Sequence, residues 1–451
     1  MTRKASAFVP EPRHVLVIGA GMAGLGAARL LQDSGVRVTV IEARDRIGGR
    51  THTSHLWPDL PVDMGASWIH GTKGNPMTKL AKELGLKVTP TTYDMSVTRD
   101  DQGREIDFIK PAKHALAMVE RARARVDDAE TDMSLQAAIE AFPEWKALSD
   151  HDRRVARLAI NTRIEHEYGG DWALMSAWHF DDGKDMGGHE AVVTPGYGLM
   201  AHHLAQGLDI RLDEPALKIS PLRDGVEVTT TKGAHHADHA IITLPLGILK
   251  AGRVTFGEPL DRARQRAIDT LGMGLLNKCI LRFDRAFWPA EVDWMEILGP
   301  LETLWADWTS YLKATGQPCL AGFNAARTAD EVEGWDDATT TASAMEALRA
   351  MFGSSVPDPL GHQISRWRND PFALGAYSFK AVGTRTKDRK ALFGTDWDGR
   401  ISFAGEATSK DYPATVHGAL LTGQAAATAL LPRHQSKTEG RPTSWWRTST
   451  S

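Results

Sequence analysis

The first forty residues change their hydrophobic pattern twice, and the changes predict a strand, a turn, a helix and a second strand. Residues 15–18 are all apolar, which is typical of a strand buried on both faces of a parallel sheet. A glycine turn separates them from a helix predicted over residues 22–32, and residues 36–41 form the next strand. This order predicts an α/β fold.

The later pattern indicates two domains woven together rather than placed in series. A charged, alanine-rich helical region covers about residues 110–163, strand-like runs return from residue 210, and residues 400–431 repeat the strand–turn–helix order. At 451 residues the chain is longer than a single hydrophobic core usually supports, so we expect two domains. The predicted parts are an N-terminal tail (1–12), a nucleotide-binding domain (13–80, 195–260 and 385–432), an α+β substrate-binding domain (81–194 and 261–384) and a disordered C-terminal tail (433–451).

The first turn has the spacing of a dinucleotide site. Gly19, Gly21 and Gly24 follow the G-x-G-x-x-G pattern. The first glycine permits the tight turn, the second lets the backbone approach a pyrophosphate, and the third lets the helix pack close to the sheet. The helix N-terminus would direct free N–H groups at the phosphates. Glu42 ends the next strand, where its carboxylate can accept hydrogen bonds from a ribose.

A second glycine turn favours FAD over NAD as the dinucleotide. Residues 42–50 read Glu-Ala-Arg-Asp-Arg-Ile-Gly-Gly-Arg. Arginines that flank a backbone turn suit an extended pyrophosphate, because a guanidinium forms paired, charge-assisted hydrogen bonds. We therefore predict that Arg44, Gly49 and Arg50 bind FAD.

Composition and charge narrow the class of protein. The formal charge is −4 and no basic tract is present, so we expect no nucleic-acid partner. No apolar run reaches the length of a membrane span, and neither a secretory signal nor a disulfide framework is indicated, so we expect a cytoplasmic protein. His235, His236 and His239 lie near a polar turn, and we predict no metal site. No pattern indicates the oligomeric state.

Four further motifs occur in the order found in one enzyme family. They are Gly-Ala-Ser-Trp-Ile-His-Gly (65–71), Leu-Pro-Leu-Gly-Ile-Leu-Lys (244–250), Asn-Lys (277–278) and Phe-Ala-Gly-Glu-Ala-Thr-Ser (403–409). Over about residues 15–431 the chain resembles the flavin-dependent amine oxidases, especially their polyamine oxidase branch, and also the catalytic region of flavin-type histone lysine demethylases. The resemblance implies the amine oxidase fold, in which a Rossmann-like FAD-binding domain is interwoven with an α+β substrate-binding domain.

The resemblance also implies roles for particular positions. Lys278 matches the lysine that holds a water against the flavin, although a lysine in a strand is usually a snorkelling surface residue. His70 matches a histidine beside the substrate, although an imidazole in a glycine turn can simply cap backbone groups. Tyr377 matches one wall of the amine site. The further cofactor contacts that the resemblance implies are Met64, Gly65, Ala66, Ser67, Leu217, Trp367, Glu406, Thr415 and Val416.

Substrate contacts are expected from aromatic walls, which orient the amine, and from acidic residues, which hold its other cationic nitrogens. The predicted contacts are Trp68, Glu165, Glu167, Trp178, Glu190, Tyr377 and Thr415. Thr415 stands where many family members have a second aromatic wall. Ala376 stands where monoamine oxidases have the cysteine that links the flavin, so we predict non-covalent FAD.

The predicted activity is oxidation of a polyamine or a related secondary amine. Hydride transfer to flavin N5 would give an imine, which water hydrolyses to an aldehyde and an amine, while oxygen is reduced to hydrogen peroxide. The expected partners are therefore a small cationic amine and molecular oxygen. Three alternatives stay open: oxidative demethylation of N-methyl-lysine or a small N-methylamine, desaturation of an apolar substrate, and a flavin-holding interaction protein without turnover.

Overall fold

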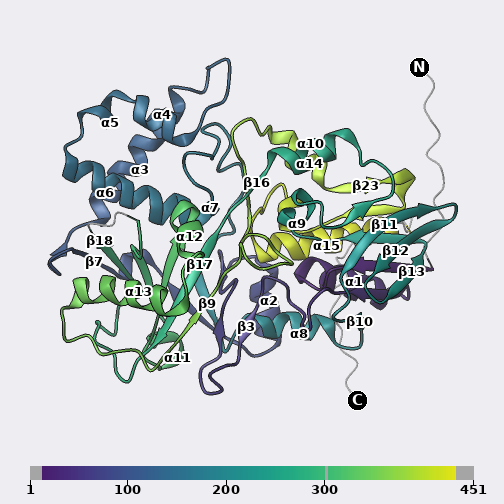
Figure 1. Ribbon diagram of the computed structural model, residues 1–451, viewed down its shortest axis with the longest axis horizontal. Helices are drawn as coiled ribbons and strands as arrows, with labels where there is room; N and C mark the ends of the chain where they lie inside the picture. The colour runs from purple at the N-terminus through teal and green to yellow at the C-terminus, as the bar shows by residue number, and fades with distance from the viewer. Residues whose placement is uncertain (1–12, 300–302, 433–451) are drawn as a thin grey trace, which may run out of the picture.

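A computed structural model of the protein describes residues 13–299 and 303–432. The predicted tails, 1–12 and 433–451, lie outside the described residues. Figure 1 shows two halves arranged along the longest axis of the molecule, and the chain passes between them several times. We call them the nucleotide half and the substrate half.

The nucleotide half is built on a mainly parallel sheet, the nucleotide sheet. Its strands, in spatial order, are β10 (Asp209–Arg211), β2 (Arg37–Ile41), β1 (His14–Ile18), β14 (His239–Ile242), β24 (Ile401–Phe403) and β23 (Gly394–Asp396). Only the pairing of β23 with β24 is antiparallel among these strands. Val15 and Val17 face one hydrophobic core and Leu16 and Ile18 face another. The predicted α/β fold is confirmed, and the two cores explain why β1 is apolar throughout.

Helices cover one face of the nucleotide sheet, and a second sheet with helices covers the other. On the first face, α1 (Met22–Asp33) and α15 (Val416–Leu430) pack so closely that a Cβ on Gly423 would lie 2.0 Å from the Ala23 oxygen. The helices α2 (Pro76–Glu83) and α8 (Gly198–Ala205) complete this layer. The opposite layer contains β13 (Gly233–Ala237), β12 (Gly225–Thr230), β11 (Ala216–Leu222), β15 (Thr255–Phe256), α9 (Leu246–Lys250), α10 (Arg262–Thr270) and α14 (Thr386–Leu392).

The substrate half is built on a mainly antiparallel sheet, the substrate sheet. Its strands, in spatial order, are β21 (Gly361–Ile364), β17 (Leu276–Arg282), β20 (Cys319–Ala325), β19 (Asp307–Ser310), β18 (Trp294–Leu298), β7 (Ser96–Asp100) and β8 (Glu105–Ile106). One face packs against α13 (Asp337–Phe352) through residues such as Leu281, Met295 and Trp308. Because strand residues alternate between faces, the intervening residues point to the other face.

A helical layer accounts for the predicted helical region and lies beyond the substrate sheet (Figure 1). It contains α3 (Ile109–Ala124), α4 (Leu135–Ala141), α5 (Pro143–Ala147) and α6 (Asp150–Ile160). A π-helical turn (Asn161–Glu165) follows α6 and leads into the short α7 (His166–Tyr168). Such turns insert one extra residue and change the direction of the side chains that follow them.

The remaining elements are short, and they lie within the two halves or between them. They are β3 (Thr53–Ser54), β4 (Val62–Asp63), β5 (Trp68–Ile69), β6 (Lys87–Thr91), β9 (Glu190–Thr194), β16 (Gly272–Met273), β22 (Ser378–Phe379), α11 (Leu312–Thr315), α12 (Ala326–Val332) and 3₁₀ turns at Tyr93–Met95, Trp397–Gly399 and Glu406–Thr408. Across residues 13–299 and 303–432, none of the helices has the length and apolar character needed to cross a bilayer.

Candidate active site

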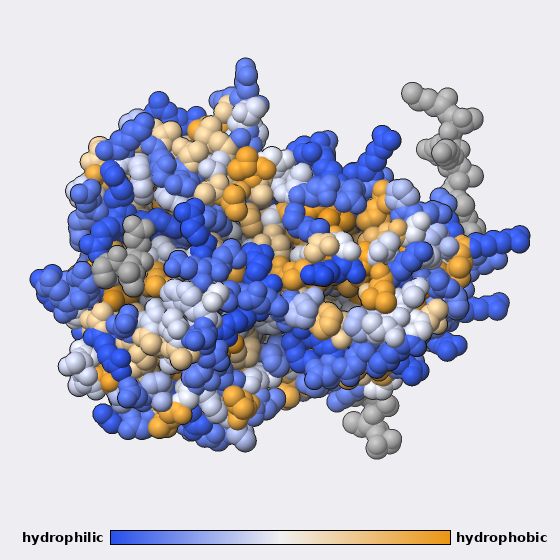
Figure 2. Space-filling view, viewed as in Figure 1, coloured by the Kyte–Doolittle hydropathy of each residue, from blue (hydrophilic) through white to orange (hydrophobic). Residues whose placement is uncertain are grey.

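A cavity of about 1070 Å³ runs between the two halves and is lined by residues of both. At one end it reaches the first glycine turn and Glu42, and at the other it reaches the substrate sheet at Lys278 and Asp307. Figure 2 shows a largely hydrophilic face, with apolar residues grouped near its middle and over the nucleotide half. The cavity thus joins the predicted dinucleotide site to the predicted amine site.

The first glycine turn forms an open cradle at the N-terminus of α1. Gly19 has a φ of +108°, and a Cβ on Gly24 would lie 1.9 Å from the Gly19 oxygen, so both positions require glycine. Gly21 faces open space and caps α1 without a side-chain hydrogen bond, so N–H groups of the first helical turn are free for phosphate oxygens. Gly24 does not line the cavity, and it acts by packing.

Glu42 connects the two glycine turns. Its side chain is buried, and its Oε2 accepts a hydrogen bond from the Ala20 N–H at 2.7 Å. Its Oε1 accepts from the Arg44 N–H at 2.9 Å. The carboxylate lines the cavity at the end of β2, as a ribose ligand requires. The chain therefore has the cradle, the free N–H groups and the carboxylate that the adenosine and pyrophosphate of FAD need.

Both predicted FAD-binding arginines line the cavity, and both are held by carboxylates. Arg44 donates to the two oxygens of Asp370 at 2.8 and 2.7 Å. Arg50 donates to Glu406 Oε1 and to the Ala376 oxygen, each at 2.9 Å. Asp370 and Ala376 belong to one segment, 367–377, which therefore ties the substrate half to the second glycine turn.

Lys278 is buried at the junction of the two halves. It is 4% exposed, so it is not a snorkelling surface residue. Its Nζ donates to the backbone oxygens of Asp63 at 2.9 Å and Gly65 at 2.6 Å, and to Ser67 Oγ at 2.5 Å. Burial lowers the pKa of Lys278 to about 8, against the opposing charge of Asp63. One ammonium thus fixes the segment that the resemblance places along the flavin.

The other predicted flavin contacts surround this segment. Trp367 donates its indole N–H to the Met64 oxygen at 3.1 Å. Thr415 caps α15 by accepting from the Gly418 N–H at 2.9 Å, so the N-terminus of α15 lies at the cavity wall. The predicted residues that line the cavity here, or at its adenosine end, are Gly49, Met64, Gly65, Ala66, Ser67, Leu217, Trp367, Glu406, Thr415 and Val416.

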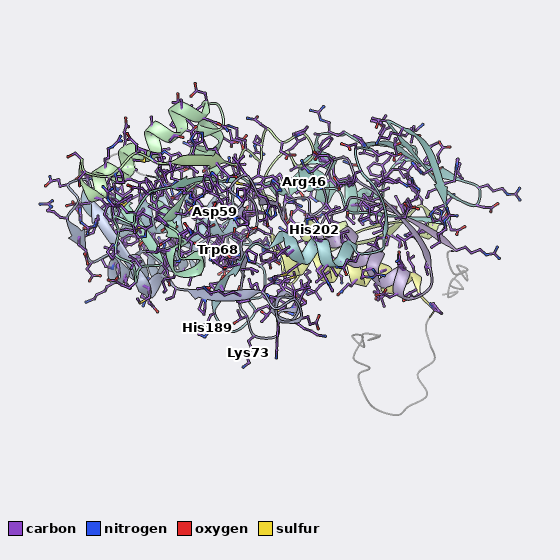
Figure 3. The ribbon with its side chains drawn as sticks, turned by 90° about the horizontal axis from the view of Figure 1, so that it is seen from below. Arg46, Asp59, Trp68, Lys73, His189 and His202 are labelled. Carbon is purple, nitrogen blue, oxygen red and sulfur yellow. The ribbon has the colours of Figure 1, made fainter. Side chains whose placement is uncertain are left out.

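Aromatic rings form the wall on the amine side. Trp68 stacks on Trp294 at 5.5 Å, and Trp294 stacks on Tyr93 at 4.5 Å between ring centroids. Tyr377 also lines the cavity, and its hydroxyl donates to the backbone oxygen of His166. Figure 3 shows Trp68 within the body of the molecule, whereas Lys73 and His189 lie at its edge. An amine would therefore lie against rings that orient it.

A histidine–glutamate pair stands at the mouth of the cavity, beside Glu167. His70 Nδ1 lies 2.6 Å from Glu190 Oε2, and the side chains are 47% and 49% exposed. Burial acts to lower the pKa of His70, but the hydrogen bond with Glu190 and the charges of Glu167 and Asp185 outweigh it and raise the pKa to about 9. At neutral pH the pair is ionic, and Glu167, which also lines the cavity, has no cation partner among the described residues.

Replacing Glu190 by glutamine is expected to lower the pKa of His70 from about 9 towards the ordinary value of about 6.5, because an amide cannot stabilise the imidazolium. An NMR titration of the imidazole checks this, and Glu227→Gln at the surface pair with His236 should leave His70 unchanged. Since the raised pKa stabilises the folded state below about pH 6.5 and this effect is lost as pH rises through about 9, the stability difference between the two proteins should shrink over that interval. An unchanged pKa would contradict the pairing.

The predictions that Glu165 and Trp178 contact the substrate are wrong, because neither lines the cavity. Glu165 is 2% exposed and accepts from Arg157 at 2.7 Å, from Asn161 at 2.8 Å and from the Trp172 N–H at 3.1 Å. Residues two apart on a helix point in different directions, so Glu167 reaches the cavity and Glu165 cannot.

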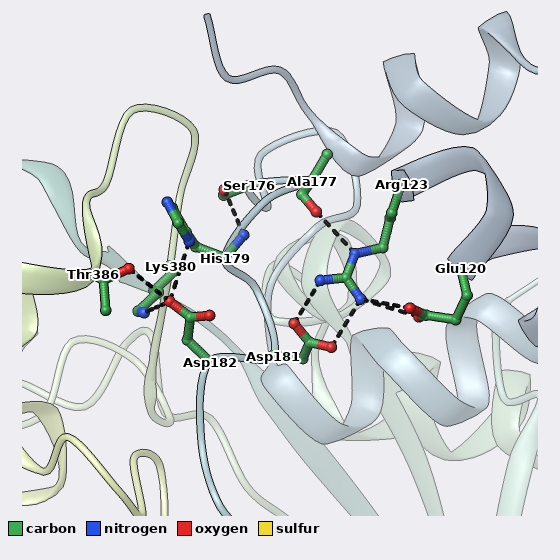
Figure 4. Close-up of polar contacts among 9 residues, drawn as sticks. All are labelled: Glu120, Arg123, Ser176, Ala177, His179, Asp181, Asp182, Lys380 and Thr386. Atoms are coloured by element: carbon green, nitrogen blue, oxygen red, sulfur yellow. Dashed lines mark hydrogen bonds and ion pairs between the residues drawn. The ribbon is translucent and has the colours of Figure 1, made fainter. Parts of the chain in front are cut away.

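Trp178 points towards the helical layer instead, and its indole N–H donates to the Val126 oxygen at 2.8 Å. Figure 4 shows why the surrounding segment is fixed there. Arg123 of α3 binds Asp181 at 2.6 Å and the Ala177 oxygen at 2.9 Å. Asp182 is bound by Lys380 from the substrate half.

Sequence reasoning missed a polar group on the substrate sheet. It also missed the π-helical turn (Asn161–Glu165) that faces this group. Asp307 on β19 accepts from the Tyr93 hydroxyl at 2.9 Å and lies 3.4 Å from His166 Nδ1. Glu296 on β18 lies 2.7 Å from Arg163 Nη1. Asp307, Tyr93, Arg163 and His166 all line the cavity. The available signal was a carboxylate within the otherwise apolar strand Trp-Met-Glu-Ile-Leu and a second carboxylate beside the tryptophan of Asp-Trp-Thr-Ser.

The histidines near the polar turn have separate partners. His235 contacts Glu214 at 2.6 Å, His236 contacts Glu227 at 2.9 Å, and His239 contacts Ser402 at 3.0 Å. In the part of the chain that the structure describes, no three histidine, cysteine or acidic side chains are grouped as metal ligands.

FAD is expected to leave the protein on denaturation. Ala376 lines the cavity where a linking cysteine would stand, and the chain's two cysteines, Cys279 and Cys319, are buried away from the cavity lining. Denaturation followed by gel filtration should therefore give a colourless chain and free yellow FAD. Colour that stays with the chain would contradict non-covalent binding.

Comparison with known proteins places this site in a family. The model of the flavin containing amine oxidoreductase family matches residues 22–431. Polyamine oxidase 4 of Oryza sativa subsp. japonica is 37% identical over 436 residues, covering 92% of this chain and 88% of that protein. Polyamine oxidase 2 of Arabidopsis thaliana is 34% identical over 452 residues, covering 94% and 90%.

A histone demethylase and a solved structure extend the comparison. Lysine-specific histone demethylase 1 homolog 1 of Arabidopsis thaliana is 33% identical over 449 residues, covering 93% of this chain but 52% of that protein. A putrescine oxidase redesigned in its cofactor binding shares the fold, with a TM-score of 0.75 and 19% identity over 93% of this chain and 98% of its own. The chain belongs to the flavin-containing amine oxidoreductase family, and its cofactor is FAD.

Proposed function

We propose that the protein oxidises a polyamine or a related secondary amine to an imine, which water hydrolyses to an aldehyde and an amine. When bound, FAD accepts a hydride equivalent from the carbon next to nitrogen, and oxygen then takes the electrons to give hydrogen peroxide. The observation that carries the proposal is the continuous cavity, which joins the dinucleotide cradle to an aromatic and acidic chamber at the buried Lys278.

The nucleotide half would hold the cofactor by groups that are already oriented. The free N–H groups of α1 would bind the pyrophosphate, and Glu42 would accept from the ribose. Glu406 holds Arg50 in place at 2.9 Å, and Lys278 fixes residues 63–67, which would line the flavin. None of these groups must reorganise during the reaction, which is how a preorganised site lowers a barrier.

The substrate half would orient the amine and control its charge. A protonated amine has no nitrogen lone pair to support hydride loss, so the reacting nitrogen must be neutral. An apolar wall of Trp68, Trp294 and Phe323 favours the neutral form by excluding water. Glu167 at the mouth attracts cationic substrates, which argues against an apolar substrate and therefore against desaturation.

A peroxide assay on the purified yellow protein tests the proposal. The panel contains putrescine, spermidine, spermine, their N-acetyl forms and N-methyl-lysine, and the aldehyde product identifies the bond that is cut. We expect peroxide with at least one polyamine. Turnover of N-methyl-lysine alone would favour demethylation. No turnover from protein whose flavin is reduced by dithionite would overturn the proposed substrate class.

A further inference from the structure

Arg389 is a buried arginine in the cavity wall that has no role in the site as described so far. It lies on α14 in the nucleotide half and is 2% exposed. In the part of the chain that the structure describes, Arg389 pairs with no carboxylate, and its Nε has no hydrogen-bond partner. Burial lowers its pKa to about 10, against the more distant charges of Glu406 and Asp182, and Asp182 is itself bound by Lys380. A buried charge without a direct partner destabilises a fold, so packing alone does not explain this arginine.

The hydrogen bonds of Arg389 lead in one direction, towards Glu406. Arg389 Nη1 donates to Ser378 Oγ at 2.7 Å and to the Ala407 oxygen at 3.1 Å. Because a guanidinium only donates, the Ser378 hydroxyl must accept from it and direct its single proton elsewhere. That proton is donated to Glu406 Oε2, 2.7 Å away. One polarised hydroxyl therefore connects the buried cation to the buried carboxylate.

Glu406 in turn holds two walls of the cavity. Its Oε1 accepts from Arg50 of the second glycine turn at 2.9 Å. Its Oε2 also accepts from the Ala414 N–H at 3.2 Å. Ala414 has a φ of +60°, which is uncommon for a residue with a Cβ, and it precedes Thr415, the N-cap of α15. A protonated carboxyl would replace one of these acceptors by a donor, so the arrangement requires Glu406 to be ionised.

The charges around Glu406 keep it ionised although it is buried. Burial acts to raise the pKa of Glu406, but the charges of Arg50 and Arg389 and the hydrogen bond from Ser378 outweigh it and lower the pKa below its ordinary value. Tyr377 also faces Glu406, and burial raises the pKa of its hydroxyl, which stays neutral. Arg389 is therefore one of two cations on which the charge of Glu406 depends.

We propose that Arg389 is a positioning residue for FAD, which keeps Glu406 ionised through the hydroxyl of Ser378. The ionised Glu406 then holds Arg50 and the N-terminus of α15 in the arrangement that receives the cofactor. This inference concerns the binding of FAD and does not depend on which amine is oxidised. It predicts that FAD affinity becomes sensitive to acid when Arg389 is lost.

Arg389→Met tests the assignment by the pH dependence of FAD binding. Methionine removes the charge and the donor, so the pKa of Glu406 should rise and its carboxylate should be lost as the pH falls. FAD is titrated into apoprotein and the flavin fluorescence is followed at about pH 5.5 and about pH 8, on either side of a carboxyl pKa raised by burial. We expect the affinity of Arg389→Met to fall about 10- to 100-fold at the lower pH and to recover most of this at the higher, while wild type changes little. No loss, or equal losses at the two pH values, would overturn the proposal.

Arg264→Met is the matched control. Arg264 is also a buried arginine of the nucleotide half, 3% exposed, and it supports the same helix by donating to the Leu392 oxygen of α14 at 2.6 Å. It is bound to Asp396 at 3.0 Å and does not line the cavity. Both variants should lower the stability of the fold, but only Arg389→Met should make FAD affinity depend on pH. The same dependence in Arg264→Met would overturn the assignment.

Ser378→Ala decides the question if Arg389→Met does not fold. This change keeps the charges of Arg389 and Glu406 and removes the hydroxyl that connects them. FAD affinity should fall about 3- to 10-fold at the lower pH and less at the higher. Unchanged affinity in Ser378→Ala would contradict the connection. Because FAD binding is measured without an amine, the result holds even if the protein oxidises none of the amines tested, in which case only the proposed function fails.

Discussion

Replacing Lys278 by methionine is expected to slow flavin reduction by the amine, or reoxidation by oxygen, by about 10²- to 10³-fold, the usual effect of removing one preorganised donor. Methionine keeps the apolar stem and the length of the side chain but has no proton to donate. The oxygens of Asp63, Gly65 and Ser67 then lose their shared ammonium. Rapid-mixing measurements of the two half-reactions show which step depends on Lys278. FAD should remain bound, because the nucleotide cradle is untouched.

Lys380→Met is the matched control for this effect. Like Lys278, Lys380 is 4% exposed. Its ammonium is bound to the carboxylate of Asp182, and it does not line the cavity. Both substitutions remove a buried ammonium and should lower the stability of the fold. Only the change at Lys278 should slow the half-reactions. Equal kinetics in the two variants would show that Lys278 is structural.

The cofactor end of the site could be predicted from sequence because its signals are local. Gly19, Gly21 and Glu42 lie within one strand–turn–helix–strand unit, so their spacing in sequence fixes their position in space. Arg44 shows the limit of such signals. It lines the cavity as predicted, but its partner is Asp370, which lies 326 residues further along the chain. Pairing across that distance leaves no local pattern.

The amine end was harder to predict because it depends on side-chain direction and strand register. The extra residue of the π-helical turn decides which of Glu165 and Glu167 reaches the cavity. Asp307 becomes part of the site only through pairing of β19 with β18 and β20, and neither register is readable from one sequence. For the same reason the parallel pairing of β7 with β18, from distant segments, could not be foreseen.

Replacing Glu42 by alanine is expected to weaken FAD binding on the order of 10³-fold, because the change removes several hydrogen bonds to one buried carboxylate. Glu42 lies at the end of β2 and orients both glycine turns: Oε2 accepts from Ala20 at 2.7 Å, and Oε1 accepts from Arg44 at 2.9 Å. Alanine leaves those two N–H groups unpaired and removes the acceptor for the ribose. The affinity is measured by titrating apoprotein with FAD and following the flavin fluorescence.

Glu214→Ala distinguishes loss of the contact between Glu42 and the cofactor from a general loss of fold stability. Glu214 is a buried carboxylate of the same half, bound to Thr230 at 2.7 Å and to His235 at 2.6 Å, but it does not line the cavity. Both variants should unfold at lower denaturant concentration, since each leaves buried donors unpaired. If Glu42 acts on the cofactor, only its loss lowers the affinity for FAD, and excess FAD should restore activity to Glu42→Ala. If both variants lose FAD alike, Glu42 supports the sheet and does not bind the ribose.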